Sequence, residues 1–194
     1  MQGFFHAILS IIVAVMIQGG VSGAVDTPPE DAVTEFMTGL TTGDEDVLAR
    51  YMDNEYVNFI IHVEGDEKTT DRMVAAIFEN FEYEESGTAE KGRSAVVKVK
   101  IKTNDFSKVM DAYDKASYKY VMDNLYEDEV TDKKKLNAKC LDLYVEQIER
   151  AAEKKPTEEK TLYMPMISDG YGGWKLLIDD EQMKAIMGNL AMPE

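Results

Sequence analysis

Cysteine and histidine are nearly absent from this chain, and their scarcity excludes several kinds of site. Cys140 is the one cysteine among 194 residues, so no disulfide can form within the chain and stability must come from a packed core. After residue 24 the one histidine is His62, which excludes a zinc site built from two histidines or several cysteines. A Ser-His-Asp triad would have to use His62, which has no nucleophile-elbow motif around it. We therefore predict no catalytic residue, no metal and no cofactor.

Positive charge is also scarce. The chain has 21 lysines and arginines against 37 aspartates and glutamates, for a net charge of −16. This balance argues against nucleic acid and anionic lipid as partners, because phosphate contacts need a basic face. A basic protein partner and weak calcium binding remain alternatives. However, the acidic clusters at 44–46 and 179–181 lack the alternating ligands of an EF-hand loop and suit helix N-termini instead.

A long apolar run occurs only at the start of the chain. Residues 4–17 are almost wholly apolar, but the run is shorter than the roughly 20 residues that a membrane span needs. The small residues Ser22, Gly23 and Ala24 follow, as a signal peptidase requires, although no lysine or arginine precedes the run. We predict a signal peptide over 1–24, cleaved near Ala24, with a retained N-terminal anchor as the alternative. The mature protein would be secreted or extracytoplasmic, without a membrane span.

The first half of the mature chain shows helical spacing of its apolar residues. Thr27 and Glu30 suit a capping box, with Pro28 in the first turn, and Asp44 suits the cap of a second helix. Residues 56–63 are equally compatible with a helix and a short strand. A further helix is predicted after them.

Two pairs of segments have the period of β-strands. In 95–103 valine and isoleucine alternate with lysine, and 81–84 alternates aromatic and acidic residues, so the two should pair antiparallel with opposite charges facing. Segments 161–167 and 174–178 flank a glycine-rich turn. Pro165 predicts an edge or a bulge in the first of them. No repeat or linker divides the chain, so 25–194 is predicted to be a single domain.

Helical spacing returns between the two strand pairs, over about 105–154, and predicts a helical hairpin. The whole order of elements resembles the NTF2-like superfamily, and more narrowly secreted Gram-positive proteins known as domains of unknown function (DUF4878 and DUF5105). The resemblance rests on Glu30-Asp31-Ala32, Gly43-Asp44, the strand 97–101 followed by Asp105, and the turn and strand 169–176. It implies an α+β fold: an NTF2-like cone in which N-terminal helices pack on a curved antiparallel sheet, with the helical hairpin inserted. Unlike many such relatives, this chain has no cysteine directly after the predicted leader to accept a lipid.

Four aromatic residues are candidates for a ligand-binding surface. We expect Phe59, Tyr83, Tyr163 and Trp174 to line a concave face of the sheet and receive an apolar ligand, unless they fill the core. The predicted function is binding of a small ligand or a protein partner in the cell envelope. The alternatives are a carboxylate-based isomerase or hydrolase in the cone, and a structural or interaction module that acts through the hairpin. Formation of a homodimer is a further alternative.

Each of these functions predicts a different structural feature. A ligand binder should have a sizeable pocket with few ionisable groups. An enzyme should bury an aspartate or glutamate whose pKa is raised. An interaction module should have a filled interior and an exposed apolar patch on the hairpin.

Overall fold

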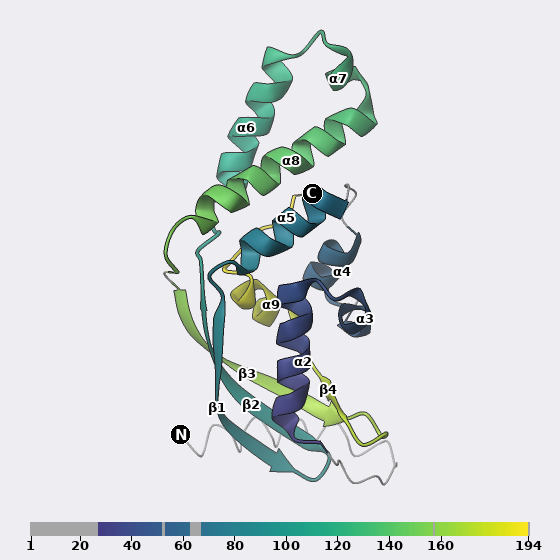
Figure 1. The fold of residues 1–194 in the computed structure, drawn as a ribbon, viewed down its shortest axis with the longest axis vertical. Helices are drawn as coiled ribbons and strands as arrows, with labels where there is room; N and C mark the ends of the chain where they lie inside the picture. Colours follow the sequence, from purple (N-terminus) through teal and green to yellow (C-terminus); the bar gives the residue numbers. More distant parts are fainter. Residues whose placement is uncertain (1–26, 52, 63–66, 157, 194) are drawn as a thin grey trace.

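The structure is a computed structural model that describes residues 27–51, 53–62, 67–156 and 158–193. The predicted signal peptide over 1–24 lies outside the described residues. Figure 1 shows an elongated molecule, with the β-sheet at one end of the long axis and a pair of long helices at the other. Within the described part of the chain, no helix is long and apolar enough to cross a bilayer.

The N-terminal half is helical, and its local signals are mostly those of the sequence. It contains α2 (Pro29–Thr42), α3 (Glu45–Leu48), the short 3₁₀ helix η1 (Ala49–Tyr51), α4 (Glu55–His62) and α5 (Glu67–Phe78). Gly43 ends α2 in the left-handed conformation, and the Asp44 carboxylate accepts the backbone N–H groups of Asp46 and Val47 to cap α3. The segment left open between helix and strand is α4, with Val57 and Ile60 on its buried side.

The predicted cap of the first helix is wrong. Pro28 holds the N-cap position of α2, and no side chain caps the helix. Thr27 Oγ1 instead donates a hydrogen bond to the carbonyl of Gly172, 3.1 Å away, in the turn before β4. The long-range contact therefore replaces the local one, and it ties the start of the described chain to the sheet.

The sheet is antiparallel throughout, in the order β1-β2-β3-β4. Its strands are β1 (Glu82–Lys91), β2 (Ser94–Thr103), β3 (Glu158–Ser168) and β4 (Trp174–Leu176). The α+β class and the predicted charge pairing are confirmed, since Glu82 faces Lys102 and Glu84 faces Lys100, with the Lys102 ammonium 3.2 Å from the Glu82 carboxylate. The register between β2 and β3 continues through Pro165 without a shift, so Pro165 does not mark a bulge in this pairing.

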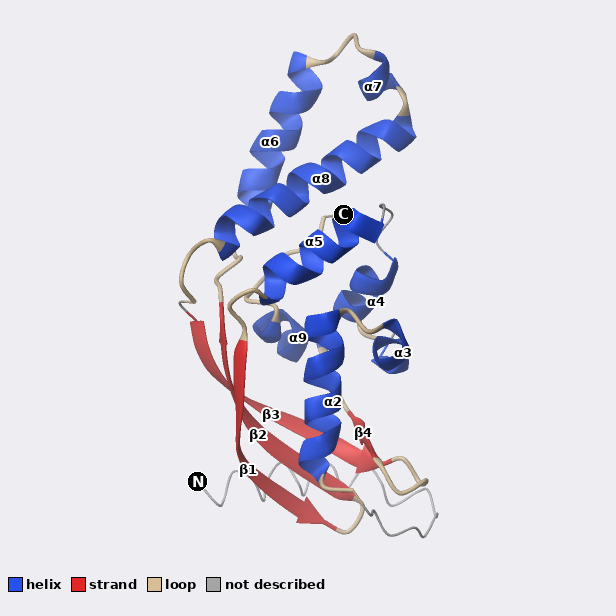
Figure 2. Ribbon diagram, in the orientation of Figure 1, coloured by secondary structure: helices blue, strands red, loops and turns tan. Residues whose placement is uncertain are grey.

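One face of the sheet is covered by helices, and this interface is the core (Figure 2). Alternate residues of β2 and β3 meet the inward sides of α2, α5 and α9 (Asp180–Ile186), which a capping box at Asp179 and Gln182 begins. The fully buried members include Val33, Phe36, Met37, Leu40, Met73, Val97, Val99, Ile101, Met164, Met166, Met183 and Ile186. The side chains of the helices therefore pack directly on the sheet.

The helices inserted between β2 and β3 are α6 (Val109–Asp123), the short α7 (Asp128–Thr131) and α8 (Lys133–Ala152). The C-terminal half of α8 lies along α5, and α6 packs against α8 (Figures 1 and 2). Tyr144 of α8 is fully buried and makes edge-on ring contacts with Tyr113 of α6 and Phe59 of α4. The opposite ends of α6 and α8, with α7, project beyond the rest of the molecule.

An ion-pair cluster also holds α8 on α5. The Arg72 guanidinium donates to both oxygens of Glu149 and to Asp142, each at 2.8 Å. These hydrogen bonds lower the pKa values of Asp142 and Glu149 and raise the pKa of Arg72. A carboxylate with a lowered pKa stabilises the folded state above its ordinary pKa, and this contribution is lost as pH falls through the lowered value.

We expect Arg72→Met to lower the free energy of unfolding by about 1 kcal/mol at pH 7, because the cluster is about one-third exposed and partly screened. The difference from the parent protein should be smaller at a pH of about 3 than at pH 7, because this stabilisation is lost progressively below the ordinary carboxylate pKa values. Urea unfolding at the two pH values measures both. Arg50→Met, which removes the more exposed pair with Glu35, is the control and should cost less. An equal loss from Arg72→Met at both pH values would contradict the electrostatic assignment.

Candidate functional site

The four aromatic residues predicted to line a ligand site lie in four separate elements. Phe59 on α4 is 6.4 Å from Tyr144 between ring centroids, and Tyr83 on β1 is 6.2 Å from Phe81. Trp174 on β4 is buried, and its indole N–H donates to the carbonyl of Thr27 at 2.9 Å. Each of these three rings packs on or beside the core.

Tyr163 is separated from the other three by the sheet itself. It is opposite Lys98 in the β2–β3 ladder, whereas Tyr83 is opposite the buried Ile101. Residues opposite each other share a face and successive residues alternate, so Tyr163 lies on the outer face and Tyr83 on the inner face. The structure therefore does not bring the four residues together. Tyr163 alternates with Met164 and Met166, which are buried on the inner face, and this alternation is the signal that could have placed Tyr163 on the outer face.

The carboxylates offer no buried acid or base in the described residues. The buried polar side chains there are amides and hydroxyls: Asn54, Ser94, Thr103, Asn104, Gln147 and Ser168. Asp105 has a lowered pKa, chiefly because Ser107 donates hydrogen bonds to it. The described chain also contains no group of three or more histidine, cysteine, aspartate or glutamate residues placed to hold a metal ion. The feature predicted for a carboxylate enzyme is thus not found among these residues.

A cavity of about 550 Å³ opens between α2, α3, α4 and α5. Leu48, Ile60 and Val74 are among the apolar residues that line it, and Glu45, Asp71 and three threonines are the polar ones. None of the four predicted aromatic residues lines this cavity. It is a mixed polar and apolar cleft on the helical side.

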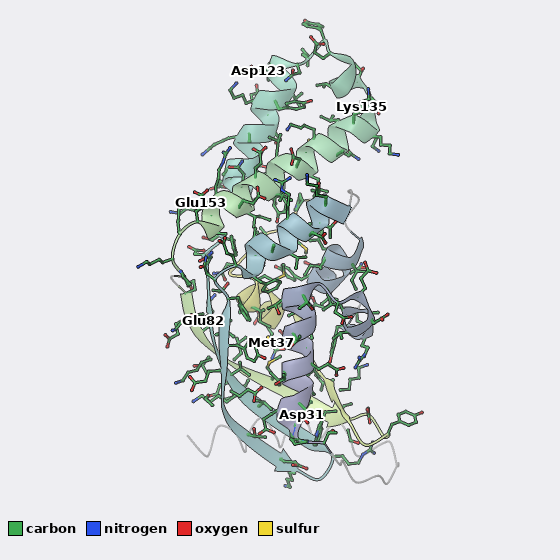
Figure 3. The ribbon with its side chains drawn as sticks, in the orientation of Figure 1. Asp31, Met37, Glu82, Asp123, Lys135 and Glu153 are labelled. Carbon is green, nitrogen blue, oxygen red and sulfur yellow. The ribbon has the colours of Figure 1, made fainter. Side chains whose placement is uncertain are left out.

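The clearest group of exposed apolar side chains lies at the projecting end of α6. Four large apolar side chains are exposed there: Tyr118 by 69%, Met122 by 51%, Leu125 by 45% and Tyr126 by 95%. We call these four residues the hairpin tip. Figure 3 shows Asp123, between them in the sequence, at the opposite end of the molecule from Asp31.

Local structure fixes which side chains the hairpin tip presents. Tyr118 and Met122 are one turn apart, so they share a side of α6, while Tyr113 on another side packs against Tyr144 of α8. Asn124 ends α6, with both its backbone and side-chain N–H groups donating to the carbonyl of Tyr120. Leu125 and Tyr126 therefore follow the helix in a turn. The helix itself ends at Asp123, so Leu125 lies outside α6.

Comparison with known proteins places most of the chain in one family without giving an activity. The model of the family described as "Domain of unknown function (DUF5105)" matches residues 40–191. YcdA of Bacillus subtilis strain 168, whose crystal structure is described as that of a candidate lipoprotein, is 19% identical with a TM-score of 0.44. The match covers 94% of this chain but 54% of that one, so this chain spans about half the length of the solved structure. No curated protein matches the sequence.

Proposed function

This chain belongs to the DUF5105 family, and we propose that it is an extracytoplasmic interaction module that binds a protein partner through the hairpin tip. The observation that carries the proposal is the clustering of four exposed apolar side chains within nine residues of a projecting element. Single exposed apolar residues are common on protein surfaces, but a contiguous group marks a binding surface. Tyrosine and methionine are also among the residues enriched in protein interfaces.

Charge around the hairpin tip identifies the chemistry of the partner. Residues 118–135 contain four lysines against five acidic residues, so this segment is nearly neutral on a chain of net charge −16. Lys133, Lys134 and Lys135 are consecutive and exposed at the start of α8, and none forms an ion pair with a described residue. The complementary partner is a protein with an apolar groove for the hairpin tip and with carboxylates where it meets Lys133, Lys134 and Lys135. A second copy of this chain is a poorer candidate, because two bodies of charge −16 repel each other.

The point at which the N-terminal segment joins the sheet would leave the hairpin tip accessible to a partner. Thr27 is held at the sheet end through Gly172 and Trp174. A leader or anchor over residues 1–24 would therefore join the domain at that end. The hairpin tip lies at the other end of the long axis, where it would face away from the attachment point (Figure 1).

We also propose that the fold is an NTF2-like cone with a filled interior. The antiparallel sheet, the helices on one of its faces and the insertion between β2 and β3 support this assignment. Along the inner face Val97, Val99, Ile101 and Met164 are completely buried. A filled interior and an exposed patch on the hairpin are together the combination expected of an interaction module.

Photocrosslinking tests the proposal directly. We would place p-benzoylphenylalanine at Tyr126 of the full chain in the producing cells, and at Tyr171 in a matched control. Tyr171 is 97% exposed, but it lies in the turn between β3 and β4 at the other end of the molecule. We expect a discrete protein adduct from position 126 and none of that mass from position 171. Identical adducts from both positions, or none from position 126, would refute the proposal.

Binding of the partner so identified then measures the contribution of the hairpin tip. The double variant Tyr118→Ser/Met122→Glu should weaken the affinity by at least about 100-fold, as expected when central apolar contacts are lost. Tyr171→Ser should leave it within about twofold. Because all three substituted side chains are exposed, the variants should melt with the parent protein in calorimetry. Unchanged affinity in the folded double variant would show that the partner docks elsewhere.

A further inference from the structure

A second cavity, at the base of the hairpin, is unusually basic for this acidic protein. It has a volume of about 290 Å³ and lies between the first turn of α6 and the last turns of α8. Its charged lining residues are Lys108 from one side, Arg150, Lys154 and Lys155 from the other, and Asp105. Four cations thus face one carboxylate, on a chain with a large excess of acids.

The carboxylates nearby neutralise little of this positive charge. Asp105 Oδ1 already accepts the backbone N–H of Ser107, and Lys108 and Lys160 both help to lower the Asp105 pKa. Arg150 has a loose ion pair, 3.4 Å from Glu146 of the same helix. Lys108, Lys154 and Lys155 form no ion pair with any residue that the structure describes.

Helix electrostatics explains only one side of the cavity. Arg150 and the two lysines that follow α8 lie where the negative end of the helix favours cations. Lys108, by contrast, is the N-cap residue of α6, where a cation is unfavourable and where no side chain caps the helix. The N-terminus of α6 and Lys108 therefore both add positive potential to the same small volume, and a bound anion would stabilise both.

We infer that this cavity is a binding site for a small oxyanion with two or more carboxylate or phosphate groups. The cations lie at the adjoining ends of two helices, so one ligand can contact both ends at once, which favours multivalent over monovalent anions. The cavity is at the lower end of the usual size of small-molecule sites, and it suits a compact ligand. This inference is independent of the function proposed for the hairpin tip, which lies at the other end of α6.

Calorimetric titration of the full chain with citrate, pyrophosphate and acetate in about 0.15 M salt tests the site. We expect saturable binding of one citrate or one pyrophosphate, with a dissociation constant of about 1 mM or below. Acetate should bind at least tenfold more weakly. Whichever of citrate and pyrophosphate binds more tightly shows whether the site prefers carboxylate or phosphate groups. Absence of saturable binding by both would overturn the inference.

Two charge-matched double variants distinguish this cavity from general attraction. Lys108→Gln/Lys154→Gln should weaken binding of the tighter anion at least tenfold. Lys91→Gln/Lys100→Gln removes two exposed lysines from the sheet and should change it less than twofold. Equal weakening by both pairs of substitutions would refute a specific site. An NMR titration with the tighter anion should shift the amide signals of Lys108 and Val109, and shifts confined to other residues would also refute it. Tyr126→Ser should bind the anion as the parent does, which separates this result from that of the hairpin tip.

Discussion

Replacement of Gly188 by alanine should lower the free energy of unfolding by about 3–4 kcal/mol, one of the two largest effects that we expect. Gly188 follows α9 with φ +60°, where a side chain is strained by about 1 kcal/mol. A Cβ atom there would also overlap the backbone carbonyl of Asn104 and lie 3.0 Å from the Phe106 ring. The Phe106 N–H donates to the Gly188 carbonyl at 2.7 Å, so the backbone segments around Gly188 and Phe106 cannot move apart without breaking this hydrogen bond. Overpacking against fixed backbone adds about 2–3 kcal/mol.

Gly92 provides the matched control for this substitution. It has a nearly identical φ of +63°, but nothing lies within 4 Å of the position that its Cβ would occupy. Gly92→Ala should therefore cost only the conformational strain, about 1 kcal/mol. Thermal unfolding of both variants measures the difference, which should be on the order of 10 °C or slightly less in Tm for a chain of this size. Equal destabilisation by the two would contradict the proposed clash at Gly188.

The second large effect is expected at Tyr144, which joins the hairpin to the body. Its side chain is fully buried, its hydroxyl donates to the Ala191 carbonyl at 2.8 Å, and its ring contacts Tyr113 and Phe59. Tyr144→Ala should lower the free energy of unfolding by about 3–5 kcal/mol through loss of apolar contact and the cavity left behind. Urea unfolding at neutral pH measures this loss.

Two other tyrosine substitutions separate the contributions. Tyr144→Phe keeps the ring and removes one hydrogen bond, so it should cost only about 1 kcal/mol. Tyr126→Ala removes the same atoms as Tyr144→Ala, but from a side chain that is 95% exposed, and it should stay within about 0.5 kcal/mol of the parent. If Tyr126→Ala were as harmful as Tyr144→Ala, the hairpin tip would be part of the core and not a surface for a partner.

Local patterns predicted most of the secondary structure. The alternation of Val97, Val99 and Ile101 with lysines located β2 and its buried face, and the acidic residues of β1 predicted its partner. Gly43 and Asp44 marked a helix boundary that the structure places at the same residues. These signals succeed because caps and strand alternation depend on neighbours in the sequence.

The candidate sites could not be predicted in the same way. Tyr118 and Met122 fit an ordinary helix, and only the position of α8 shows that they are exposed. Likewise Lys108 and Lys154 are 46 positions apart in the sequence, and the packing of α6 on α8 brings them to one cavity. Thr27 was assigned a local capping role that a contact with Gly172, far along the chain, replaced.

Residue type and short-range spacing were sufficient to predict the α+β class, the buried face of β2, the helix boundary at Gly43 and Asp44, and the charge of the molecule. They were not sufficient to predict which apolar residues remain exposed, which aromatic residues share a face, and which cations converge. Those properties depend on how distant segments pack, and a residue's spacing within its own helix or strand carries little information about what the rest of the chain places against it.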